Sequence, residues 1–208
     1  GKQTAKIGLF RPLVAVQTAF SFIVLFVGGL FLTSFSNLTR SDLGFDSNDV
    51  VIASLEANEL GRAGQKGPEV WRPLLERLAT SPGIESAGIS GWGLFEGSTS
   101  TQTLRVRGRA VEAFEPFYLS VSPGYLETMR IELLDGRQFE WRDVQVTGDS
   151  SVIVNESFVQ RYFPGERAIG KRFFVVGPAN RLIAQDIIGI VRDTKYASVR
   201  DPAPPTVF

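Results

Sequence analysis

An uninterrupted apolar segment near the N-terminus constrains this chain more than any other feature. Residues 13–35, LVAVQTAFSFIVLFVGGLFLTSF, contain no charged side chain. At about 1.5 Å per residue, a helix of this length spans roughly 34 Å, which exceeds the hydrocarbon core of a bilayer at about 30 Å. The segment therefore predicts a transmembrane helix.

Two alternatives to a permanent span fit this segment less well. A cleaved signal peptide has an apolar core of about 7–15 residues followed by a small-residue cleavage site. Here the run is longer, and LTSFSNLTRSD after it offers no such site. A buried helix of a soluble protein is seldom apolar around its whole circumference. Gln17, Ser21 and Gly28 fall near one stripe, which suits packing against another transmembrane helix.

The charges on either side of the span predict its direction. The preceding flank carries only basic residues and the following flank is mainly acidic: Lys2, Lys6 and Arg11 before it, and Arg40, Asp42, Asp46 and Asp49 after it. By the positive-inside rule, residues 1–12 are a cytoplasmic segment and the rest of the chain lies outside. We expect a polar linker at 36–46 and an extracytoplasmic core domain at 47–208, incomplete at its C-terminal end.

The composition argues against an enzyme or a nucleic-acid-binding protein. Lys plus Arg equals Asp plus Glu at 22 each, so no excess charge points to nucleic acid. The chain has no cysteine and no histidine, which removes disulfides, thiolate metal sites, the commonest general base and the commonest metal ligand. We therefore expect no catalytic, cofactor-binding or metal-binding residue in this chain.

Alternating and helical patterns predict an α+β domain, with a mixed sheet built from two strand-helix-strand halves. In the first half, a strand at 49–57 precedes a helix in VWRPLLERLAT and a second strand at 84–92. In the second half, SVIVN is a buried strand, Asn155 caps a short helix that Pro164-Gly165 ends, and strands follow in RFFVVG and at 187–193.

The patterns between and after these halves predict further elements. Residues 101–109 and 114–122 alternate like strands, and IELLDGRQF predicts a strand and a turn. In SPGYLETM, we expect Ser122 as the N-cap of a helix, Pro123 at its first position and Glu127 in its first turns. At the end of the chain, Phe208 could begin another strand.

Three groups of residues suggest binding sites, but ordinary structural roles also explain them. The glycines at 61, 64 and 67 and at 88, 91 and 93 match no phosphate-binding pattern, so turns explain them better. Four acidic residues spread over 135–149 could bind Ca²⁺, but their spacing does not match an EF-hand loop and also suits a solvated loop: Asp135, Glu140, Asp143 and Asp149. Trp92, Phe95 and Trp141 suit either a contact surface or core packing.

Three sequence blocks, in order, carry a resemblance to a known family. They are SPGYLETMRIELLDGRQFEWRD at 122–143, VIVNESFVQRYFPGERAIGKRF at 152–173, and IIGIVRDTKYASVRDPAPPTVF at 187–208. From about Leu13 onward, the chain resembles permease subunits of MacB-type ABC transporters, in the FtsX-like permease superfamily. It departs from that pattern at Arg192, where a small residue is common, and at Arg167-Ala168, which replaces a proline-containing turn.

The resemblance implies a mechanical role in the cell inner membrane. It implies an ABC ATPase as subunit or fused domain, a second permease copy, the remaining transmembrane helices and a periplasmic partner. ATP hydrolysis in the cytoplasm would then drive export or mechanical work through the periplasmic domain. The family-motif residues would shape turns and helix ends: Ser122, Pro123, Gly124, Tyr125, Gly136, Arg137, Asn155, Phe163, Pro164, Gly165, Gly170 and Lys171.

A single-span sensor is the main alternative function. Its outer domain would enclose a small molecule in a concave apolar pocket with converging polar groups. A pilin-like subunit fits less well, because the basic N-terminus lacks an acidic residue near the start of the span.

Overall fold

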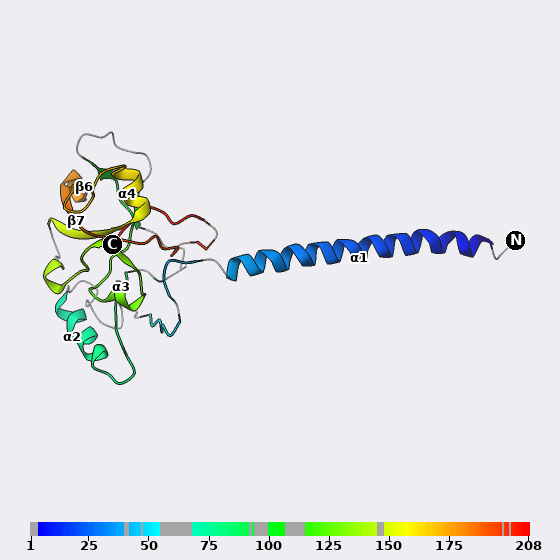
Figure 1. Ribbon diagram of the computed structural model, residues 1–208, viewed down its shortest axis with the longest axis horizontal. Helices are drawn as coiled ribbons and strands as arrows, with labels where there is room; N and C mark the ends of the chain where they lie inside the picture. Colours follow the sequence, from blue (N-terminus) through cyan, green and yellow to red (C-terminus); the bar gives the residue numbers. More distant parts are fainter. Residues whose placement is uncertain are drawn as a thin grey trace. The chain divides into compact units, whose positions relative to one another are not determined.

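The computed structural model describes residues 4–39, 42–46, 48–54, 68–91, 93, 100–106, 115–144, 148–196, 198–199 and 201–208. The chain forms two compact units, Gly1–Asp42 and Leu43–Phe208. The first unit contains one helix, and the second contains a sheet with short helices around it (Figure 1).

Helix α1 runs from Thr4 to Thr39 and is long and apolar enough to cross a membrane. Within Pro12–Thr39, an 18-residue window has a mean hydropathy of 2.2, and none of that window is buried. Thr18 and Ser21 donate hydrogen bonds to the carbonyl oxygens four residues earlier, at 2.8 and 2.9 Å. Such bonds satisfy polar side chains within the helix itself, which a bilayer requires. The helix also continues through 36–39, where we expected a polar linker.

Eight strands among the described residues form one mixed sheet in the second unit. They are β1 Ser100–Thr101, β2 Leu104–Arg105, β3 Phe117–Tyr118, β4 Leu133–Gly136, β5 Ser150–Asn155, β6 Arg172–Val176, β7 Leu182–Val191 and β8 Thr206–Val207. The order is β1-β3-β8-β5-β7-β6-β2, and β4 also pairs with β7. The β5–β7 and β3–β8 pairs are parallel and the others antiparallel. The predicted α+β class with a mixed sheet is therefore confirmed.

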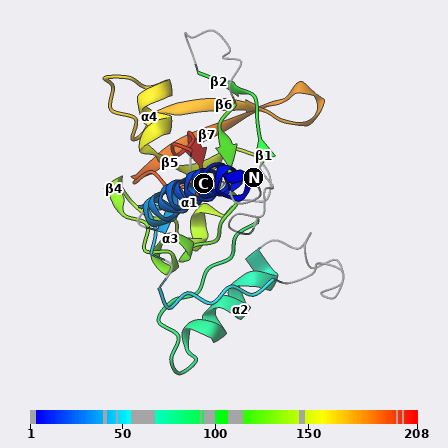
Figure 2. The ribbon, with the colours of Figure 1, turned by 90° about the vertical axis from the view of Figure 1, so that its right-hand side faces the viewer.

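The sheet curls back on itself, because the strands at its two ends are neighbours in the chain. Only Gln102 and Thr103 separate β1 from β2, yet β1 pairs with β3 and β2 pairs with β6. The amide of Val176 donates to the carbonyl oxygen of Thr103 at 3.2 Å, which extends the β6 pairing. Figure 2 shows β2 and β1 along one continuous stretch of chain. One six-residue segment thus joins both ends of the sheet.

The central strand β5 separates two hydrophobic clusters. Val152 and Val154 point to one cluster and Ile153 to the other, as alternation along a strand requires. In the first cluster the ring of Phe158 lies 4.7 Å from that of Tyr162 and 5.3 Å from that of Phe173, measured between centroids. The predicted buried strand is therefore confirmed, and it is buried on both faces.

Helix α4 follows β5 directly and forms the predicted second half with β6. Helix α4 runs from Glu156 to Tyr162, and Figure 1 shows it beside β6 and β7. Helix α3 spans Tyr125–Thr128, and short 3-10 turns lie at Trp141–Asp143 (η2) and Pro178–Asn180 (η3). The helix of the predicted first half is also present, as α2 at Pro68–Ala79.

The two strands predicted beside α2 are wrong where the structure describes them. Residues 49–54 form no strand, and 55–57 lie outside the described part. The segment 84–91 contributes a single bridge, between Ser90 and Val121, and residue 92 is not described. Val51 is 92% exposed, so its β-branched side chain has no pleated surface to pack against. The pattern of residues 49–52 is that of a strand, but the fold provides no partner.

The strands predicted at 101–109 and 114–122 are present but shorter. Each is reduced to two-residue pairs at β1, β2 and β3, while 107–109 and 114 lie outside the described part. The carboxylate of Glu115 accepts hydrogen bonds from the hydroxyls of Thr101 and Thr103, at 2.9 and 2.5 Å. These bonds hold the segment 100–105, which carries β1 and β2, against the chain that leads into β3.

Candidate functional site

The motif at 122–125 forms a turn that differs from the predicted helix start. Helix α3 begins at Tyr125 with Gly124 as its N-cap, so the predictions of Ser122 as N-cap and Pro123 as first helical residue are wrong. Gly124 adopts φ 86°, a left-handed conformation that postpones the helix past Pro123. The Ser122 hydroxyl instead accepts a hydrogen bond from the amide of Ile89 at 2.9 Å. It fastens the segment before residue 90 to this turn.

Gly136 is the last residue of β4, and Arg137 follows it directly. Gly136 has φ 82°, and a Cβ there would lie 2.2 Å from the carbonyl oxygen of Ile188, so only glycine fits. The guanidinium of Arg137 makes a bidentate ion pair with Asp143, at 2.6 and 2.7 Å. The Asp143 side chain is only 6% exposed, and the hydrogen bond from Arg137 lowers its pKa to about 2.

The four acidic residues considered as a cation site make separate structural contacts, and Asp135 accepts from the amide of Gly136 at 2.8 Å. Asp143 pairs with Arg137, Glu140 pairs with Arg142 at 2.9 Å, and Asp149 accepts from the amide of Ala184 at 3.2 Å. Within the described ranges, no three acidic, His or Cys side chains are grouped as metal ligands.

The side chain of Asn155 makes hydrogen bonds to two parts of the chain that are far apart in sequence. Its side chain is fully buried, and Oδ1 accepts from the amides of Phe158 and Thr206 at 3.0 and 2.8 Å. Its Nδ2 donates to the carbonyl oxygen of Pro204 at 2.8 Å. The predicted N-cap is confirmed. The same side chain also holds β8, which residue spacing did not reveal.

The motif from Phe163 to Lys171 forms the exit of α4 and the turn before β6. Helix α4 ends at Tyr162, as predicted from Pro164-Gly165, and Phe163 is buried in the ring cluster of Phe158. The amide of Gly170 donates to the carbonyl oxygen of Ile187 at 2.9 Å. Lys171 pairs with Glu166 and lies 5.8 Å from the Phe163 ring centroid. These residues shape turns and bring no reactive groups together.

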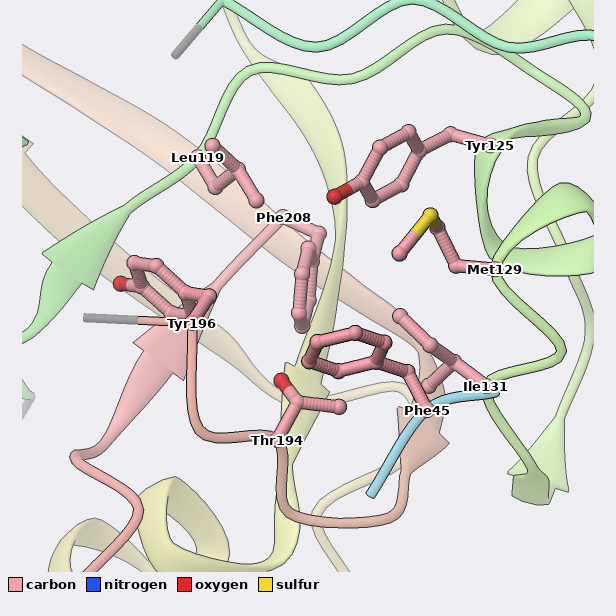
Figure 3. Close-up of a pocket in the computed structure, with 8 residues that line it drawn as sticks. All are labelled: Phe45, Leu119, Tyr125, Met129, Ile131, Thr194, Tyr196 and Phe208. Carbon is pink, nitrogen blue, oxygen red and sulfur yellow. The ribbon is translucent and has the colours of Figure 1, made fainter. Parts of the chain in front are cut away.

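A small pocket lies in the second cluster (Figure 3), lined by Phe45, Leu119, Tyr125, Met129, Ile131, Thr194, Tyr196 and Phe208. It has room for about one water molecule, far below the several hundred Å³ of small-molecule sites. Figure 3 shows the rings of Phe45 and Phe208 across its middle and the Tyr125 hydroxyl pointing inward. The pocket does not provide the ligand cavity that a sensor domain needs.

Two of the lining side chains carry buried hydroxyls without a hydrogen-bond partner among the described residues. They are Thr194 Oγ1 and Tyr196 OH, and Tyr118 OH near the first cluster is a third. Burial raises the pKa of Tyr196 to about 12 and raises that of Tyr118 as well, so both phenols stay neutral.

Only one of the three aromatics considered as a contact surface lies in the described part. Trp141 is half-buried and receives the Arg72 guanidinium from α2, 5.7 Å from the ring centroid. Trp92 and Phe95 lie outside the described residues. The Arg72–Trp141 contact joins α2 to η2.

Comparisons with known proteins place the chain in a family. Residues 18–206 match the model of the MacB-like periplasmic core domain. None of the curated proteins compared with the chain matches it.

Two solved structures are similar at low identity. The periplasmic region of MacB from Actinobacillus actinomycetemcomitans is 19% identical over 59% of this chain and 50% of that chain, with a TM-score of 0.43. The extracellular domain of the noncanonic ABC-type transporter YknZ from Gram-positive bacteria is 15% identical over 64% of this chain and 58% of that one, with a TM-score of 0.41. The chain therefore spans about half the length of these structures, and likenesses this distant carry no argument about individual residues.

The family match includes most of α1 as well as the sheet. It confirms the resemblance predicted from the three sequence blocks. An apolar N-terminal helix followed by this domain fits a membrane-anchored permease fragment. Because the match covers 18–206 of 208 residues, the chain belongs to the family of MacB-like periplasmic core domains.

Proposed function

We propose that this chain is the anchor and extracytoplasmic core domain of an ABC transporter permease in the inner membrane. In this role, the domain couples ATP hydrolysis by a separate or fused ATPase to export or mechanical work. The observation that carries the proposal is the family match, which runs without a break from α1 into the curled sheet. The core is thereby joined in sequence to a membrane helix.

The direction of the span supports this arrangement. Basic residues precede α1 and mainly acidic residues follow it, which favours a cytoplasmic N-terminus and a core domain on the far side of the membrane. ATP is hydrolysed in the cytoplasm, so a coupling domain outside receives its signal through transmembrane helices, of which α1 is one.

The structural use of polar side chains, one buried and two partly exposed, supports a mechanical role. Asn155, Arg137 and Lys171 each hold a turn or a strand in place through hydrogen bonds or ion pairs. Residues with such roles stiffen a domain that must move as a body. We infer that force, and not a bound substrate, is what this domain handles.

The proposed partners derive from the same family membership. They are an ABC ATPase, a second permease copy, the remaining transmembrane helices of the parent protein and a periplasmic protein. The stripe of Gln17, Ser21 and Gly28 on α1 suits helix packing within such an assembly.

The test is to purify the full-length parent protein from native membranes and identify the copurifying proteins by mass spectrometry. An ATPase in stoichiometric amount, or an ATPase domain in the same chain, is the expected result. An unrelated single-span protein carrying the same affinity tag serves as the control. A parent chain that ends in a kinase-like or other signalling domain, with no ATPase recovered, would replace the permease with the sensor.

A further inference from the structure

The four residues from Leu43 to Asp46, here called the clasp, are bound to distant parts of the core domain. The amide of Lys195 donates to the carbonyl oxygen of Leu43 at 2.9 Å. The amide of Asp46 donates to the carbonyl oxygen of Met129 at 3.1 Å, and its carboxylate pairs with Arg130 at 2.8 Å. The clasp therefore joins the end of α3 to the segment that follows β7.

At Gly44 the backbone of the clasp lies directly against the backbone of Asp193. Gly44 adopts φ +76°, and a Cβ added there would lie 1.9 Å from the carbonyl oxygen of Asp193. Asp193 is itself fixed, because its carboxylate accepts from the amide and hydroxyl of Ser157 at 2.9 and 2.6 Å. Its amide donates to Glu156 at 3.2 Å. Through Asp193 the clasp is thus tied to the first turn of α4.

Phe45 supplies the apolar part of the attachment. Its ring lies in the small pocket, where Figure 3 shows it beside Phe208, Thr194 and Ile131. It packs against the second cluster, which contains Ile153 of the central strand. Partial burial of this large ring stabilises the attachment more than the exposed ion pair of Asp46 does.

The clasp is the first segment of the core unit along the chain. Only residues 40–42 separate the end of α1 at Thr39 from Leu43. On the other side, 48–54 form no strand and Val51 is almost fully exposed, but Val50 packs against the second cluster. A pull on the first residues of the core domain therefore reaches the clasp before it reaches any strand.

We propose that the clasp is the mechanical junction through which displacement of α1 enters the sheet, with Gly44 and Phe45 as its positioning residues. The source of the displacement rests on the proposed function. If the clasp opens, β7, α3 and α4 no longer receive the movement through residues 43–46, and Val50 is the next apolar side chain of the described chain that packs against the second cluster. With the clasp closed, β7, α3 and α4 receive the movement together.

The first experiment measures attachment by amide hydrogen exchange in the full chain, reconstituted in lipid nanodiscs. Gly44→Ala is compared with Gly83→Ala, since Gly83 has a similar φ of +84° but open space around it. We expect the exchange rates of the Asp46 and Lys195 amides to rise by about tenfold or more in G44A and to stay unchanged in G83A. Unchanged exchange rates of these two amides in G44A would contradict the proposal that the clasp attaches α1 to the sheet.

A gentler pair of variants covers the case in which G44A fails to fold. Arg130→Gln removes the ion pair of the clasp, and Arg172→Gln removes a similar pair on β6, to Asp186. Both arginine side chains are 51% exposed, so the two changes are matched. We expect R130Q alone to raise the exchange rate at Asp46, by a few-fold. Equal exchange rates of the Asp46 amide in R130Q and R172Q would contradict the proposed attachment.

The second experiment tests transmission in the parent permease purified with its ATPase. Exchange at β5 and β7 amides is compared with and without a non-hydrolysable ATP analogue, and nucleotide binding is measured in each sample. If movement passes through the clasp, the ATP analogue changes the exchange rates of the β5 and β7 amides in wild type and in G83A. In G44A this change is lost, although the sample still binds nucleotide. A G44A response equal to wild type would refute transmission through the clasp. No response in wild type would refute the proposed function itself.

Discussion

At the scale of single residues, Asn155 connects three parts of the chain with one amide group. It caps α4 and also binds the start of β8 at Thr206 and the preceding chain at Pro204. The sequence predicts the cap because an Asn directly after an apolar strand is a common helix start. It does not predict the bonds to β8, because the partners lie about fifty residues away and only the fold brings them together.

Replacing Asn155 by Ala should lower the free energy of unfolding by about 3–4 kcal/mol. The change removes the N-cap, leaves two buried amides without their acceptor, and takes away one of the two hydrogen bonds to the carbonyl oxygen of Pro204. Asn155→Ser, which keeps a short acceptor at the cap but does not reach Pro204, should cost about half as much. Urea unfolding followed by circular dichroism gives both values. A loss below about 1 kcal/mol for N155A would show that β8 is held by other contacts.

The Asp143 carboxylate should make stability depend on pH in the acidic range. Its pKa in the folded protein is about 2, below the ordinary value of 3.8, so its contribution is fully present above about pH 4. The contribution is lost as the pH falls towards 2. We expect the stability difference between wild type and Asp143→Asn to shrink by about 1–2 kcal/mol between pH 5 and pH 2, since Arg137 is partly exposed and screened.

Denaturant unfolding of both proteins at several pH values checks this expectation. Arg137→Gln serves as the control, because it should abolish most of the difference by removing the main cause of the lowered pKa. A difference that is constant across the range would show that the ion pair does not stabilise the fold.

At the scale of elements, the β5-α4-β6 unit is predicted from its sequence more fully than any other part. A continuous apolar strand, a capping Asn, an amphipathic turn and Pro-Gly are local signals that agree with one another. The strands predicted around α2 fail because β-branched residues signal a strand only where a partner exists. Ser122 fails as a cap because Gly124 takes the left-handed conformation before the helix can start. The clasp could not be foreseen, since its partners are 129–130 and 193–195.

Helix α4 should depend on the ring of Phe158 more than on any exposed apolar side chain. Phe158 is fully buried, and its ring lies close to those of Tyr162, Phe163 and Phe173. Phe158→Ala should lower the free energy of unfolding by about 3–5 kcal/mol, and Leu182→Ala, at a half-exposed site, by less than about 1. Chemical denaturation compares the two variants. Equal losses would contradict the central place of Phe158.

At the scale of the whole molecule, the chain divides into an apolar helix and a folded core, and the family match spans both. The division was foreseeable because a long uncharged run differs so clearly from the mixed polar and apolar sequence after it. The curl of the sheet was not, because it depends on β1 and β2 joining opposite ends of the strand order. Short strands of this kind leave almost no periodic signal.

The position of an added charge in α1 should decide whether the chain stays in the membrane. An arginine at the centre of a span costs about 2.5–3.5 kcal/mol, whereas one near an end can reach the interface. Leu25→Arg should therefore reduce the fraction of the chain that resists carbonate extraction from membranes, and Leu13→Arg should not. Equal retention of the two variants would show that α1 does not lie across the bilayer.

The six-residue segment that closes the sheet also affects how the domain behaves at high concentration. Long unpaired strand edges act as templates on which foreign chains add and aggregate. Here both ends of the strand order are two-residue strands of the same short segment. Among the described residues, these two ends therefore offer few unpaired backbone groups to another chain and little opportunity for amyloid-like growth.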